Sequence, residues 1–175
     1  MDIQHNIQLQ PYNSFRTKAS ARLFCEPSST EELLEILKSY PREKKLIVGA
    51  GFNIFFTHDF DGLVIKPGMR GITIVSEDAE HVEIEAGAAE EWDQFVGRCV
   101  ANGYAGLENL SLIPSSVGAS PIQNIGAYGS EAKDTIVKVK AVDIRSGDFR
   151  EFTHEECAFG YRDSVFKQTR RYVTT

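Results

Sequence analysis

Residues 113–129 read IPSSVGASPIQNIGAYG and contain no charged side chain, although charged residues make up 25% of the chain. Five of the seventeen residues are large and apolar or aromatic, which favours an ordered, partly buried segment over a disordered linker. A loop of this length in a compact domain usually has a function. The chain must therefore fold so that a long segment without a helix or strand pattern is held in place. Its Gly backbone and Ser hydroxyls could face a ligand, and a surface loop is the plainer alternative.

The sequence on either side has clear strand and helix patterns. Short apolar or alternating runs predict strands over 22–25, 46–48, 63–65, 81–86, 136–143 and 149–152. Apolar residues at helical spacing predict helices over about 30–40 and 89–102, and capping boxes are expected at Ser29–Glu32 and Thr153–Glu156. Strands and helices that alternate in this way are typical of small α/β units.

Charge and cysteine usage narrow the class of protein. The formal net charge is −6 and the Lys and Arg residues are scattered, so no nucleic-acid partner is expected. Cys25, Cys99 and Cys157 have neither disulfide nor zinc spacing, which favours a reducing compartment. The four His are isolated, so no metal site is predicted. Without a signal-peptide pattern or an apolar run of about 20 residues, we expect a cytoplasmic protein that does not enter a membrane.

A glycine-rich turn follows the predicted strand at 46–48. Gly49 and Gly51 let a ligand approach the backbone, and successive N–H groups in such a turn can bind phosphate. A dinucleotide-binding Rossmann turn needs a third Gly and a helix behind it. Here Ile54 takes that third position, and no amphipathic helix is expected after it. The pattern alone leaves a phosphate site and a plain tight turn equally open.

Arg162 is a further candidate because aromatic and apolar residues surround it in the sequence, which indicates partial burial. A lone Arg is usually a surface group or half of an ion pair, here with Asp163 or Glu156. A buried Arg needs an anion, which either the protein or a ligand can supply.

Four segments in this order resemble the N-terminal half of the UDP-N-acetylenolpyruvoylglucosamine reductase (MurB) family. They are NSFRTKASA (13–21), GAGFN (49–53), GLENLSLIPSSVGASPIQNIGAYG (106–129) and FGYRDSVFK (159–167). The resemblance implies an α+β fold of the FAD-binding type-2 class, shared with vanillyl-alcohol-oxidase-like enzymes. Two small α/β subdomains are expected, at 1–70 and 71–175, with FAD between them. Because 172–175 looks like a strand that is only beginning, we expect a C-terminally incomplete fold without the family's substrate-binding domain.

The resemblance also assigns roles to residues. Those expected to contact FAD are Gly49, Ala50, Gly51, Phe52, Asn53, Pro114, Ser115, Ser116, Gly118, Ala119, Ser120, Ile122 and Gly126. Arg162 is the expected catalytic residue, which would hold the substrate carboxylate and stabilise the enolate; Tyr128 is expected beside the substrate. A fixed guanidinium suits this role, because negative charge grows on the carboxylate in the transition state. Phe52 replaces a common Ser. Ser115 replaces a common Gly, which requires either an ordinary φ or a small shift of the backbone there.

The implied activity is an oxidoreductase of peptidoglycan synthesis. With FAD as cofactor and NADPH as reductant, it would convert UDP-N-acetylglucosamine enolpyruvate to UDP-N-acetylmuramate. The family's catalytic Ser and late Glu have no counterpart here, so these 175 residues are expected to be inactive by themselves. The alternatives are a flavin-dependent alcohol oxidase of the same fold and a nucleotide-binding module without catalysis. No obligate protein partner is expected.

Overall fold

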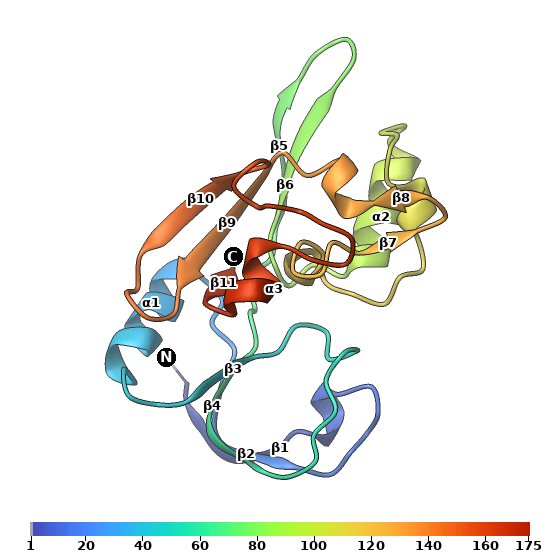
Figure 1. The fold of residues 1–175 in the computed structure, drawn as a ribbon. Helices are drawn as coiled ribbons and strands as arrows, with labels where there is room; N and C mark the ends of the chain where they lie inside the picture. Colours follow the sequence, from blue (N-terminus) through green and yellow to red (C-terminus); the bar gives the residue numbers. More distant parts are fainter. Residues whose placement is uncertain (1) are drawn as a thin grey trace.

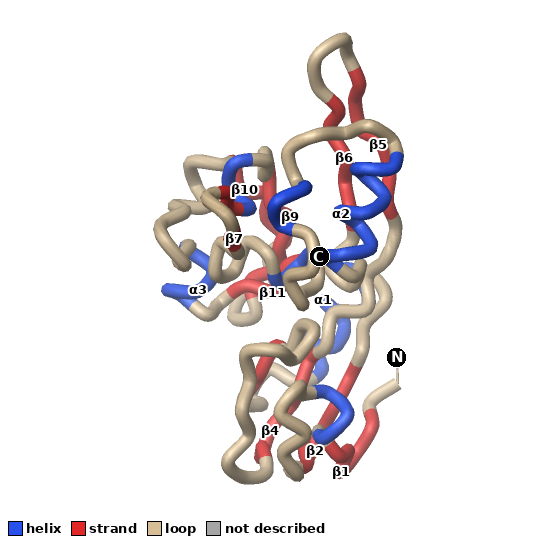
Figure 2. The backbone as a smooth tube through the Cα atoms, turned by 90° about the vertical axis from the view of Figure 1, so that its right-hand side faces the viewer, coloured by secondary structure: helices blue, strands red, loops and turns tan. Residues whose placement is uncertain are grey.

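Four strands form the sheet of the first part of the chain. A computed structural model describes residues 2–175. The strands are β1 (Gln4–Gln8), β2 (Ser20–Cys25), β3 (Lys45–Ile47) and β4 (Phe60–Ile65), in the order β1-β2-β4-β3. β1 runs antiparallel to β2, whereas β2 and β3 both run parallel to β4. This sheet lies at the bottom of Figure 1 and of Figure 2, below the rest of the molecule.

Helix α1 (Thr30–Ser39) packs on one face of this sheet. The Ser29 side chain caps it by accepting a hydrogen bond from the backbone N–H of Glu32, as the capping pattern predicts. Leu33, Ile36 and Leu37 recur at helical spacing and are buried. Both faces of β2 and β4 are covered, which explains why these strands read as continuous apolar runs.

The second part of the chain holds two further strand groups. β5 (Ile72–Glu77) and β6 (Val82–Ala86) form a hairpin that projects at the top of Figure 1. β9 (Lys138–Asp143), β10 (Phe149–Thr153) and β11 (Tyr172–Thr174) form an antiparallel sheet in the order β10-β9-β11. Helices α2 (Trp92–Ala101) and α3 (Val165–Thr169) and the short pair β7 (Gly126–Ala127) and β8 (Ser130–Glu131) complete it. Nowhere in residues 2–175 is a helix both long and apolar enough to cross a bilayer.

One hydrophobic core joins the two parts. Val142 of β9 and Val173 of β11 pack in the same cluster as residues of α1, β2 and β4. An ion pair between Arg171 and Asp143 fixes the start of β11 against β9. Burial would raise the pKa of Asp143, but hydrogen bonds from Arg171 and from the N–H of Arg145 outweigh it and lower the pKa. The ion pair and the buried Val173 therefore hold β11 in place. The division into two subdomains at residue 70 stays a prediction.

The predicted elements are confirmed with small shifts of their ends, and both capping boxes form hydrogen bonds to the backbone. α2 begins at Trp92 rather than near Ala89. The backbone before it is extended at Glu91 (φ −69°, ψ +125°), and the carbonyl groups of Ala88 and Glu90 accept hydrogen bonds from Gly118 and Val117 instead of from a helical turn. β1, β5 and α3 were not predicted: β5 is almost wholly exposed and lacks a burial pattern, and α3 has five residues.

Candidate functional site

A cavity of about 600 Å³ lies between the first sheet and the second part of the chain. Two segments far apart in the sequence line it from opposite sides: residues 49–53, here called the glycine loop, and residues 114–119, the serine segment. A Cβ atom on Gly49 would lie 3.2 Å from Cβ of Ala119 and 3.4 Å from Oγ of Ser116. The two segments therefore approach each other closely at Gly49.

The glycine loop follows β3 directly. Val48 donates to the carbonyl of Ile65, and beyond it the backbone N–H groups of residues 49–53 donate no hydrogen bond to any part of the protein within 2–175. No helix follows the loop, as predicted from Ile54. Gly51 has φ +77°, and its carbonyl accepts a hydrogen bond from Ser14 N–H. Five successive N–H groups without partners, at the wall of a cavity, suit an anionic ligand.

The serine segment is ordered by hydrogen bonds to the residues that precede α2. Trp92 N–H donates to the carbonyl of Ser115 (3.1 Å), and Gly118 N–H donates to the carbonyl of Ala88 (3.0 Å). Ser116 and Gly118 are buried, and a 3-10 helix spans Val117–Ala119. A flexible surface linker is therefore excluded for this segment. The N–H groups of Val117, Gly118 and Ala119 already have partners, whereas those of Ser115 and Ser116 donate no hydrogen bond within residues 2–175. Free backbone donors therefore come from the whole glycine loop and from these two serines.

The structure brings most of the predicted cofactor contacts to this cavity. All of them line it except Ser120 and Gly126. The Ser120 hydroxyl donates to the carbonyl of Val117 (2.8 Å), so it serves the 3-10 turn, and Gly126 lies in β7. Ser115 is not among the residues with positive φ, so the replacement of Gly at this position brings no backbone strain. Contact between these residues and FAD stays a prediction.

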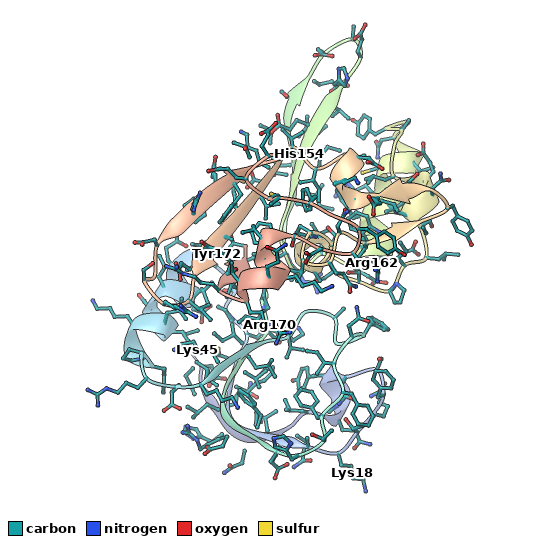
Figure 3. The ribbon with its side chains drawn as sticks, viewed as in Figure 1. Lys18, Lys45, His154, Arg162, Arg170 and Tyr172 are labelled. Atoms are coloured by element: carbon teal, nitrogen blue, oxygen red, sulfur yellow. The ribbon has the colours of Figure 1, made fainter. Side chains whose placement is uncertain are left out.

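Arg162 and Tyr128 do not line the cavity. The loop of Arg162 is nevertheless attached to it, because Ser164 Oγ donates to the carbonyl of Ile122, which does line it (2.6 Å). Arg162 is half-buried and has φ +53°; Tyr128 is exposed and has the same φ. Figure 3 shows Arg162 in the second part of the chain, to the right of Arg170.

Neither suggested ion-pair partner engages Arg162. Glu156 pairs with Arg150, and Asp163 accepts a hydrogen bond from Gln168. The guanidinium has no hydrogen bond or ion pair within residues 2–175. Its charge therefore remains available for an anion that comes from outside this part of the protein.

Sequence reasoning missed a belt of charge around the cavity. Five cationic side chains and one carboxylate, Glu91, belong to its lining, although the chain is acidic overall. The cations are Lys44, Lys45, Lys66, Lys167 and Arg170. They come from three separate regions of the sequence, 44–45, 66 and 167–170, so no local spacing predicts that they share a cavity. The small residues Gly87 to Ala89, between β6 and α2, are a signal that could have indicated a close approach of backbones.

Cys25 and Cys99 lie outside the cavity lining and are buried. Burial raises the pKa of Cys25 to about 12 and also raises the pKa of Cys99, so neither is a thiolate at neutral pH. Within residues 2–175 no three His, Cys, Asp or Glu side chains gather in a way that could hold a metal ion.

A family model described as an FAD binding domain matches residues 21–153. The UDP-N-acetylenolpyruvoylglucosamine reductase of Flavobacterium johnsoniae is 47% identical over 167 residues, which covers 95% of this chain and 50% of that protein. The protein of the same name from Pseudomonas fluorescens (strain Pf0-1) is 45% identical over 170 residues, with 96% and 50% covered. The chain thus spans about half the length of the curated relatives it matches.

A solved structure shows the same fold. The crystal structure of UDP-N-acetylenolpyruvylglucosamine reductase (MurB) from Thermus caldophilus matches with a TM-score of 0.79 and 22% sequence identity. The match covers 100% of this chain and 60% of that chain. The expected α+β fold of the FAD-binding class is confirmed.

Proposed function

The chain belongs to the family of FAD binding domains, and on that premise we propose that the cavity between the glycine loop and the serine segment holds FAD. The observation that carries this proposal is the row of five unpartnered N–H groups at residues 49–53, in a loop that lines the same cavity as the serine segment. Such a row suits a diphosphate, because it offers donors without a competing acceptor. Apolar lining residues such as Ile54 and Ile122 suit a flat ring system.

We propose further that the protein acts as a UDP-N-acetylenolpyruvoylglucosamine reductase. The names of the relatives support this assignment, since they match 95% of this chain at more than 40% identity. When bound, FAD would supply hydride transfer between NADPH and the enolpyruvyl double bond of the substrate. In this proposal the product is UDP-N-acetylmuramate and the protein acts in the cytoplasm.

The residues of the chain would supply binding and electrostatics. The glycine loop would donate hydrogen bonds to the diphosphate, and Ser115 and Ser116 would close the cavity from the opposite wall. Arg162, whose guanidinium has no partner within residues 2–175, would hold the substrate carboxylate and the charge that grows on it in the transition state. Tyr128, exposed in the same part of the chain, would lie beside the substrate.

A titration of the chain with FAD tests the binding proposal. We expect saturable quenching or enhancement of flavin fluorescence with one FAD per chain, and competition by ADP, because ADP carries the diphosphate. Riboflavin, which lacks phosphate, should compete poorly. The absence of saturable FAD binding by a folded chain would refute the proposal.

The reductase proposal has a separate test. NADPH and UDP-N-acetylglucosamine enolpyruvate are added to the FAD-loaded chain, and NADPH consumption is followed. We expect no turnover by these 175 residues alone, because the relatives with this name are twice as long. The activity itself is expected from a protein that extends these residues to the length of its relatives.

A further inference from the structure

The cavity wall contains cations in two different states. Of its five cationic side chains, four are already engaged within the protein. These contacts are Lys44 over the ring of Phe60 at 5.3 Å, Lys45 Nζ to the carbonyl oxygen of Glu43 at 3.1 Å, Lys66 to the carboxylate of Glu26, and Lys167 Nζ to the carbonyl oxygen of Arg162 at 2.6 Å. The fifth is Arg170, whose side chain has no hydrogen bond, ion pair or ring contact within residues 2–175. Figure 3 shows it between the two parts of the molecule.

Arg170 is an exposed residue of the cavity lining, between α3 and β11. Arg170 ends α3 in the left-handed conformation, with φ +49° and ψ +36°. From there the chain enters β11, where side chains alternate between two faces. Arg170, Tyr172 and Thr174 line the cavity. On the other face Arg171 pairs with Asp143 and Val173 is buried in the core.

The left-handed conformation costs conformational free energy for any residue other than Gly. That cost does not by itself identify a binding residue, because Arg16 has φ +53° and does not line the cavity. The combination is what distinguishes Arg170: strained backbone, a place in the cavity wall and a guanidinium without a partner.

We propose that Arg170 is the cation that binds the diphosphate of the ligand in this cavity; the inference rests on the proposed FAD site. The glycine loop offers only neutral N–H donors, and the serine segment carries no charge. Neutral donors can hold a diphosphate, but a positive group strengthens the binding, and a guanidinium can donate two parallel hydrogen bonds to phosphate oxygens. The firm anchoring of β11 through Asp143 and Arg171 fixes the position from which Arg170 reaches the ligand.

The test compares Arg170→Gln with the unmodified chain in FAD titrations. Loss of the charge should weaken FAD binding about tenfold, the low end of the range for a charge-assisted hydrogen bond, because Arg170 is exposed. Competition by ADP should weaken in parallel, whereas adenosine, which has no phosphate, should compete equally well with both proteins. FAD binding by the variant should also depend less on salt concentration. Arg170→Lys keeps the charge and should recover part of the affinity.

Arg16→Gln and Arg16→Gly are matched controls, because Arg16 has the same left-handed backbone away from the cavity. Neither should change FAD binding. Arg170→Gly removes both the side chain and the backbone strain, so it should be no less stable to heat and still bind FAD weakly. If Arg170→Gly binds FAD weakly but is as stable as the unmodified chain, the lost affinity comes from a lost ligand contact and not from a folding defect.

Two results overturn the inference. One is unchanged FAD affinity in Arg170→Gln; the other is an equal loss for adenosine, which would place Arg170 at the base or ribose. Either result leaves the proposed FAD site intact. Failure of the unmodified chain to bind FAD refutes the proposed function and this inference together.

Discussion

Gly51→Ala should lower the free energy of unfolding by about 3 kcal/mol and abolish measurable FAD binding. Gly51 has φ +77°, a region that costs an L-residue about 1–2 kcal/mol. A Cβ there would lie only 2.1 Å from the carbonyl oxygen of Tyr12, so the glycine loop would have to leave its place beside residues 12–14. Chemical denaturation gives the stability, and fluorescence titration with FAD gives the binding.

Gly147→Ala is the matched control for this change. Gly147 also has φ +77°, but a Cβ there would meet nothing within 4 Å. Its free energy of unfolding should fall by only about 1 kcal/mol, the cost of placing Ala in the left-handed region, and it should bind FAD normally. Equal stability losses in the two variants would contradict the close packing of the glycine loop against residue 12.

Gly118→Ala should destabilise the protein by about 1–3 kcal/mol and weaken FAD binding at least about tenfold. A Cβ on Gly118 would lie 2.5 Å from Cβ of Ala88 and 2.7 Å from Oγ1 of Thr174. These contacts join three elements of the cavity wall: the residues after β6, the serine segment and β11. The added methyl group must separate them, so the same denaturation and FAD titrations should both respond.

Gly97→Ala is the control for this prediction, because it adds the same methyl group at a position that has room for it. Gly97 lies inside α2, is exposed, and has nothing within 4 Å of the position of its Cβ. Alanine favours helix, so this variant should gain about 0.5–1 kcal/mol. FAD binding as strong in Gly118→Ala as in Gly97→Ala would show that the cavity wall does not depend on the contact at Gly118.

Patterns within a short stretch were enough to predict many parts of this fold. Apolar spacing and the Ser29 cap predicted α1, and alternation predicted β9 and β10. The uncharged composition of 113–129 predicted an ordered segment, and its backbone hydrogen bonds to Ala88, Glu90 and Trp92 confirm that order. These predictions succeed because the interactions involved are local or follow directly from burial.

What could not be predicted depends on contacts between distant residues. Gly49 faces Ala119, and Arg170 lines the same cavity as Lys45, but nothing in their spacing connects them. β5 was missed because its strand has no buried face, and its pairing with β6 defines it instead. The roles of Arg162 and Tyr128 came from family resemblance alone, and both residues lie outside the cavity lining.

Hydrogen–deuterium exchange of the chain with and without FAD tests the central claim, that one FAD molecule contacts both walls of the cavity. The amides of residues 49–53 donate no hydrogen bond within residues 2–175, so they should exchange rapidly without FAD and slowly with it. Peptides that contain Ser115 and Ser116 should gain protection at the same FAD concentration. The β5–β6 hairpin, which does not line the cavity, should not change. Protection at one wall alone, or at neither wall under saturating FAD, would contradict the account.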